Sequence, residues 1–167
     1  MIEETICDLC GEFSFIKVYQ GNIDPADDPL NYYSSSRQNA SHWPIVKCSK
    51  CGLHRSNPRD NSETLKCVYE KLADEIYDEE EDNRVFIAQK RIKEINRLSS
   101  AGKILDIGCS SGIFTQQAAK TTWKVTGLDP SHWAIMQAKK RCSTGTFLVS
   151  TIEDADFQSS EFDLITL

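Results

Sequence analysis

Hydrophobic residues along the C-terminal part of the chain form short apolar runs that alternate with helical patterns. The apolar runs predict buried strands over residues 103–108, 124–129, 146–151 and 162–167. The intervening segments predict helices over residues 113–121 and 131–141. Strands and helices that alternate in this way are typical of a parallel sheet with right-handed crossovers, so the predicted fold class is α/β.

Residues 61–100 show a different pattern, because their apolar residues recur at helical intervals. They predict two helices or one broken helix, with a solvated bend at the acidic run 78–82, where like charges repel. Residues 1–60 have few periodic runs and hold four of the seven cysteines. We therefore expect three parts: a small module over 1–60, a helical connector over 61–100 and a sheet domain from 101.

The last apolar run, residues 162–167, is apolar on both faces, as a central strand covered by helices would be. An uncovered edge of this kind promotes aggregation. We therefore expect more sheet to follow it, so that 101–167 is the N-terminal part of a larger domain.

The balance of charge disfavours some classes of partner. Nineteen Lys and Arg against 25 Asp and Glu give a net charge of −6, so nucleic acid is an unlikely partner. No run reaches the roughly 18 apolar residues of a membrane span, and the acidic N-terminus does not resemble a signal peptide. We expect a cytoplasmic protein that does not bind membranes, and we make no prediction of its oligomeric state.

The cysteines of the N-terminal module form two CxxC motifs, Cys7 with Cys10 and Cys48 with Cys51. Each motif is followed by a glycine, which permits the left-handed backbone of a metal-binding knuckle. Four thiolates predict a closed structural zinc site, with two disulfides or reduced core cysteines as the alternatives. His42 and His54 are candidate substitute ligands, which we interpret as ordinary loop histidines.

A glycine-rich turn lies between the first predicted strand of the sheet and the helix that follows it. It contains Asp106, Gly108 and Gly112, and its glycine spacing departs from the dinucleotide fingerprint because Ser110 stands in the middle position. Asp129 ends the next strand, where a carboxylate can accept hydrogen bonds from a ribose diol. Ser131 can cap the following helix, which leaves Asp129 available. These features predict a nucleoside site.

The segments ILDIGCSSGIF and VTGLDPS resemble the motifs of class I S-adenosylmethionine-dependent methyltransferases. With CDLCG and CSKCGLHRSNPRD before them, the whole chain resembles bacterial methyltransferases that carry an N-terminal zinc-ribbon-like segment. The resemblance implies a Rossmann-like sheet preceded by a zinc-ribbon-like module and helices. It also implies S-adenosylmethionine and structural zinc as cofactors.

The resemblance also implies roles for individual residues. Gly108, Cys109 and Ser110 would lie against the methionine part of the cofactor, with Asp106 anchoring the loop or binding the amino group. Asp129 would hold the ribose. The adenine would be bordered by Pro130 or Ser131 and would meet the segment Thr151, Ile152 and Glu153. Relatives often have Asp at position 151, so backbone groups of Ile152 and Glu153 would replace that side chain.

The expected activity is methyl transfer to a small-molecule acceptor, and the resemblance suggests a sugar, glycan or secondary-metabolite precursor. We name no catalytic base. Asp163 is the one candidate near the transfer centre, and we favour a structural role for it. We expect the present chain to bind the cofactor weakly or not at all and not to turn over. The alternatives are a zinc-ribbon interaction protein with a non-catalytic nucleoside-binding domain and a nicotinamide-dependent oxidoreductase.

Overall fold

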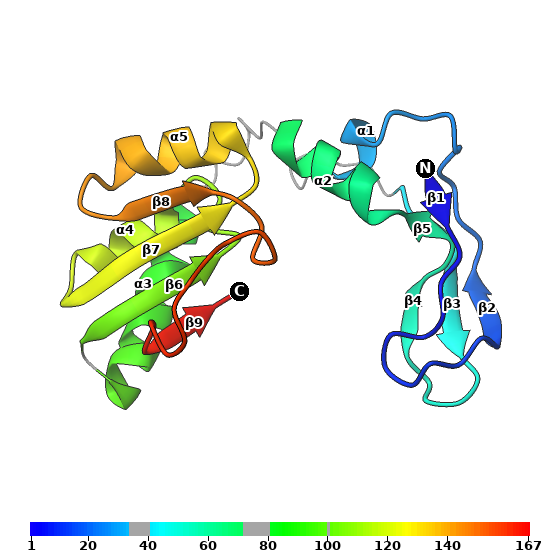
Figure 1. Cartoon of the computed structure of the whole chain (residues 1–167), viewed down its shortest axis with the longest axis horizontal. Coiled ribbons are helices and arrows are strands. Elements are labelled where there is room, and N and C mark those ends of the chain that lie inside the picture. The colour runs from blue at the N-terminus through cyan, green and yellow to red at the C-terminus, as the bar shows by residue number, and fades with distance from the viewer. Residues whose placement is uncertain (34–40, 72–80, 100) are drawn as a thin grey trace. The chain divides into compact units, whose positions relative to one another are not determined.

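Figure 1 shows the computed structural model of the chain, which describes residues 1–33, 41–71, 81–99 and 101–167. The chain divides into two compact units, Met1–Val68 and Tyr69–Leu167. In the described parts of the chain, no helix is both long and apolar enough to cross a membrane.

The first unit is built from short antiparallel strands. Strand β3 is the centre of a three-stranded sheet with the order β2-β3-β4, and β1 pairs with β5 in a separate ladder. The elements are β1 (Ile2–Glu3), β2 (Phe15–Tyr19), α1 (Leu30–Tyr33), β3 (Ile45–Cys48), β4 (His54–Ser56), β5 (Arg59–Asp60) and α2 (Ser62–Lys71). Few side chains are buried among the residues of this unit that the structure describes, and two of them are the cysteines Cys7 and Cys48.

A buried carboxylate connects the long segment between the two CxxC motifs to β5. Asp60 is 2% exposed, and its Oδ2 accepts hydrogen bonds from Tyr32 Oη at 3.0 Å, Tyr33 Oη at 3.1 Å and Trp43 Nε1 at 2.8 Å. Burial and Asp60 raise the pKa of Tyr32, so its hydroxyl remains a donor. These bonds satisfy a charge that would be costly to bury alone.

The second unit is a parallel four-stranded sheet with the order β8-β7-β6-β9 (Figure 1). Helix α4 packs against both α3 and α5 and against β7, so the three helices form a layer on the sheet. The elements are α3 (Glu81–Leu98), β6 (Gly102–Ile107), α4 (Ile113–Ala119), β7 (Trp123–Asp129), α5 (His132–Arg141), β8 (Thr146–Val149) and β9 (Leu164–Thr166).

The core of this unit lies between the helices and the two central strands. Ile104 is fully buried, and Ile135 and Ala138 of α5 pack into the same cluster with Phe147 of β8. Both faces of a parallel sheet normally require cover, which explains the near-continuous apolar runs of β6 and β7. The predicted α/β class with a Rossmann-like parallel sheet is therefore confirmed.

The predicted elements are all present, with shifted ends. The strand expected over 146–151 ends at Val149, and the one expected over 162–167 is Leu164–Thr166. Among the described residues β9 is an edge strand, and Ile165 is 57% exposed.

The solvated bend predicted over 78–82 is wrong for its last two residues, because Glu81 and Asp82 form the first turn of α3. Acidic side chains are favourable at a helix N-terminus, and Glu81 also pairs with Arg141. Residues 78–80 lie outside the described residues.

Candidate functional site

The turn between β6 and α4 is held open by backbone conformations that suit glycine. Gly108 has φ 73° and Gly112 has φ 81°, and Ser110 between them also has a positive φ of 48°. The N–H groups of Gly108 and Cys109 donate to the carbonyl of Leu128 at 2.7 and 3.0 Å. The turn is therefore tied to the end of β7, beside Asp129.

The carboxylate of Asp129 is fixed by two backbone N–H groups. Its Oδ2 accepts from Ser110 at 3.0 Å and its Oδ1 from Ser131 at 2.9 Å. Burial raises its pKa, and these two bonds act in the opposite direction. The expectation that Asp129 is left free is corrected in part, because each oxygen already accepts one bond and offers only its remaining lone pair.

A hollow of about 470 Å³ lies at this end of the sheet, in the size range of small-molecule sites. Its lining brings together eight of the residues that the sequence predicts for the cofactor. They are Gly108, Ser110, Asp129, Pro130, Ser131, Thr151, Ile152 and Glu153. A Cβ built at Gly108 would meet no atom within 4 Å, so the space beside the turn is open.

Ser131 caps α5 as predicted, since its hydroxyl accepts from Ala134 N at 3.1 Å. Thr151 behaves in the same way in the turn that follows β8. Its hydroxyl accepts from Asp154 N at 3.3 Å, and its carbonyl accepts from Ala155 N at 3.1 Å. Its side chain is therefore engaged within its own turn.

Asp106 lines a second hollow of about 640 Å³, which shares Gly108 with the first. The carboxylate is 7% exposed and accepts from Thr166 Oγ1 at 2.8 Å. Burial raises its pKa to about 6, against the Thr166 hydrogen bond and with a further contribution from Asp129. Two acidic groups thus flank the glycine turn, an arrangement that favours a positively charged ligand.

Cys109 and Gly112 differ from the other predicted cofactor residues. Cys109 is 6% exposed and belongs to the core cluster, and burial raises the pKa of its thiol. It lines the second hollow. Gly112 is not among the described residues that line either hollow, and a Cβ there would lie 2.8 Å from that of Ala138. Gly112 therefore serves the close packing of α4 on α5.

Asp163 has the structural role that we favoured. Its Oδ2 accepts from Lys103 N at 2.8 Å, at the start of β6. Gly108 lies beyond the other end of that strand. Asp163 therefore supports the pairing of β9 with β6 and is removed from the glycine turn.

Sequence reasoning missed some lining residues of the first hollow, among them Leu128 and Trp133. Trp133 belongs to the first turn of α5, directly after the predicted residues Pro130 and Ser131. The sequence signal that could have identified Trp133 is that it follows Asp129 closely and lies in the first turn of a predicted helix.

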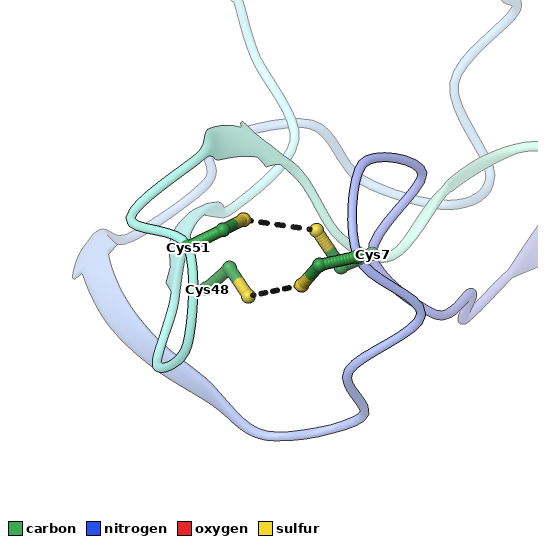
Figure 2. Close-up of side chains that lie close together, drawn as sticks. Cys7, Cys48 and Cys51 are labelled. Carbon is green, nitrogen blue, oxygen red and sulfur yellow. Dashed lines mark hydrogen bonds between the residues drawn. The ribbon is translucent and has the colours of Figure 1, made fainter.

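The two CxxC motifs of the first unit bring four sulfur atoms together. Figure 2 shows side chains of the two loops pointing toward one another, with Cys7 Sγ 3.5 Å from Cys51 Sγ. Cys10 Sγ lies 3.6 Å from Cys48 Sγ, and all four sulfurs lie within 4.8 Å of one another. A tetrahedral zinc with bonds of about 2.3 Å implies sulfur separations of about 3.8 Å, so the arrangement fits the ion.

The backbone turns of the two cysteine motifs have the predicted geometry. Gly11 and Gly52 have φ values of 72° and 78°, which confirms the predicted left-handed residue after each motif. Backbone N–H groups of Cys51 and Lys50 lower the pKa of Cys48 to about 6. Against the backbone N–H of Glu12, burial and the neighbouring cysteine sulfurs raise the pKa of Cys10 to about 12, so the four thiols are not shifted in one direction. Neither His42 nor His54 belongs to the cluster found among the described residues.

The chain was compared with known proteins. The profile of a family described as "Methyltransferase domain" matches residues 104–167. A ubiquinone biosynthesis O-methyltransferase from Rhodopseudomonas palustris is 26% identical over 150 residues, which cover 87% of this chain and 51% of that protein. An uncharacterized methyltransferase from Synechocystis is 35% identical over 68 residues, which cover 41% of this chain and 32% of that protein.

Among solved structures, the plantazolicin methyltransferase BpumL in complex with SAH aligns with a TM-score of 0.46 at 24% identity. The alignment covers 54% of this chain and 37% of that protein. A TehB-like SAM-dependent methyltransferase from Corynebacterium glutamicum aligns with a TM-score of 0.41 at 26% identity, covering 47% and 42%. The chain spans about half, or less, of the length of these proteins.

Proposed function

We propose that the second unit, whose residues 104–167 match the profile of a methyltransferase domain, is a class I methyltransferase domain that binds S-adenosylmethionine. We further propose that the protein transfers the methyl group of this cofactor to a small-molecule acceptor. The bound cofactor supplies an electrophilic methyl group on a cationic sulfur. The residues described here bind and orient it.

The first hollow would take the nucleoside. Asp129 is rigid because Ser110 and Ser131 each hold one of its oxygens, and its remaining lone pairs can accept from the two ribose hydroxyls. Gly108 lines both hollows, and Asp106 lines the second one. There the buried carboxylate would attract the cationic end of the cofactor, and such alignment is the main contribution that a protein makes to an in-line displacement.

The single observation that carries this proposal is the fixed carboxylate of Asp129 in the lining of the first hollow, within a segment that matches the profile of a methyltransferase domain. Calorimetric titration of the chain with S-adenosylhomocysteine tests it. Asp129→Ala removes two charged hydrogen bonds, so we expect affinity to fall by about 100-fold or more.

Asp156→Ala is the matched control, because it removes the same charge from an exposed position outside the lining of the hollow. We expect the control to bind within about twofold of the unmodified chain. An unmodified chain that binds no S-adenosylhomocysteine at millimolar concentration would contradict the proposal.

The Asp129→Ala variant and a thermal-shift assay separate the proposal from its two rivals. An interaction scaffold would keep its partners when Asp129 is replaced, whereas an enzyme would lose cofactor binding. A nicotinamide-dependent oxidoreductase would be stabilised in a thermal-shift assay by NADH and not by S-adenosylhomocysteine. The glycine spacing around Ser110 favours the methyltransferase.

For the first unit, we propose that Cys7, Cys10, Cys48 and Cys51 hold one zinc ion as thiolates. Four sulfur ligands close the coordination shell, so the ion would stabilise this unit and take no part in the reaction. The sulfur separations and the two left-handed glycines support this assignment. Elemental analysis of protein purified without chelators should find one zinc per chain.

For the acceptor, we propose a small molecule of sugar, glycan or secondary-metabolite chemistry. The family resemblance supports this class, and the curated relatives include enzymes named for ubiquinone biosynthesis. Thermal-shift measurements of the chain with S-adenosylhomocysteine, in the presence of panels of these compounds or of RNA, would test it. We expect further stabilisation by small molecules, and stabilisation by RNA alone would reverse the assignment.

A further inference from the structure

Two aromatic residues that the nucleoside assignment does not use line the first hollow, Trp133 of α5 and Tyr69 of α2. Trp133 lies beside Pro130 and Ser131 in sequence and lines the hollow together with the apolar residues Leu128, Ala134 and Ile152. The core cluster takes Ile135 and Ala138 from the same helix, while Met136 is 49% exposed to solvent. Half-buried Trp133 therefore lies on the side of α5 that borders the hollow.

The polar groups around this hollow are unevenly available. Asp129 keeps lone pairs for a ribose, but the Ser131 hydroxyl accepts the N–H of Ala134, and the Thr151 hydroxyl accepts that of Asp154. Two of the side chains that border the expected base therefore already accept a hydrogen bond from a backbone N–H group of their own turn. Beside the backbone groups of Ile152 and Glu153, the hollow offers the aromatic surface of Trp133 to a flat ring system. Stacking of a base on an aromatic side chain contributes substantially to binding.

We infer that the indole of Trp133 forms the wall on which the purine base of the cofactor stacks, and that this contact contributes more to binding than the Thr151 hydroxyl does. The inference rests on the proposed nucleoside site. It assigns Trp133 as a residue that determines affinity for the base. The ligand class for this subsite is a purine nucleoside, with or without its amino-acid extension.

Titration of the full chain and its variants with S-adenosylhomocysteine and with adenosine tests this assignment. Trp133→Ala should weaken both ligands by roughly tenfold or more, and by the same factor, because the lost contact is with the base. Trp133→Phe retains an aromatic face and should stay within about threefold of the unmodified chain. Thr151→Ala should also stay within about threefold, because its hydroxyl serves its own turn.

Tryptophan fluorescence gives a second measurement. The other two tryptophans, Trp43 and Trp123, are 6% and 4% exposed and are not among the described residues that line the hollow. The emission of the unmodified chain should therefore change on adding S-adenosylhomocysteine. Trp133→Phe should bind without that change, whereas Trp123→Phe should keep it.

The outcomes separate the two proposals. If the unmodified chain binds neither ligand, the proposed function fails. If it binds them and folded Trp133→Ala binds equally well, or if Thr151→Ala alone loses tenfold, the site stands and the assignment to Trp133 is overturned. A loss for S-adenosylhomocysteine without one for adenosine would also overturn it, because the contact would then lie outside the nucleoside.

Discussion

The two units of this chain are stabilised in different ways. The second unit buries a continuous apolar cluster between a parallel sheet and its helices, with Ile104 and Ala138 fully buried. Among its described residues, the first unit buries two cysteines, a tryptophan, two valines and the carboxylate of Asp60. So small an apolar core gives limited stability, and small domains commonly gain more from a metal, such as the zinc that we propose. We therefore expect the two units to respond to different perturbations.

Metal removal should produce the largest difference. Structural zinc contributes about 10 kcal/mol or more to folded zinc modules, so chelation should unfold the first unit and leave the second folded. Limited proteolysis followed by mass spectrometry measures this, with cuts expected within residues 1–60 and protection of 102–167. Equal proteolysis of both units after chelation would contradict the distinction.

Truncation of a core side chain of the second unit should destabilise that unit and leave the first unit folded. Ile104→Ala empties a fully buried position in β6 and should cost about 2–5 kcal/mol in the second unit. Denaturant unfolding followed by Trp123 fluorescence measures the loss, and the zinc content should be unchanged. The control is Ile165→Ala, at a position 57% exposed on the neighbouring strand, for which we expect a loss below about 1 kcal/mol.

Replacement of Asp60 should weaken the first unit without removing its metal. Asp60→Ala leaves three donors without their acceptor, so we expect a loss of about 2–4 kcal/mol. Asp60→Asn keeps a carbonyl oxygen of the same shape and should lose less. Thermal unfolding of the zinc-loaded protein gives the comparison, and equal losses for both variants would show that the acceptor oxygen is not the decisive group.

The smallest effect concerns pH and the second unit. The pKa of Asp106 is raised to about 6 in the folded protein from an ordinary value of 3.8, so the folded state binds more protons between these values. Wild-type stability should therefore fall as the pH rises from about 4 to 6. Asp106→Asn should remove that loss and be more stable by about 1–3 kcal/mol at pH 7, with little gain at pH 4.

Thermal unfolding of the two proteins across this pH range provides the check. A gain from Asp106→Asn that is the same at pH 4 and pH 7 would show that ionisation is not its cause. The variant should also bind S-adenosylmethionine less well at pH 7, since it lacks the Asp106 carboxylate beside the glycine turn.

Much of the architecture could be predicted because it depends on residues that are close in sequence. The left-handed Gly11 and Gly52, the Ser131 cap and the positions of β6 and β7 follow from spacing and periodicity over a few residues. The end of β8 was misplaced for a reason visible only in three dimensions. The β7–β8 pairing ends with Val149 opposite Asp129, and Thr151 is part of the turn beyond it.

The sequence alone determined which chemical groups the candidate sites contain: two CxxC motifs, a glycine-rich turn and a carboxylate at the end of the second parallel strand. Tertiary structure decided which groups meet across long stretches of chain, such as Asp60 with Trp43 and Asp106 with Thr166. It also decided that Gly112 packs on Ala138 and that Trp133 lines the hollow. The physical reason is that local backbone geometry follows from neighbouring residues, whereas burial and side-chain contacts depend on how separate elements pack together.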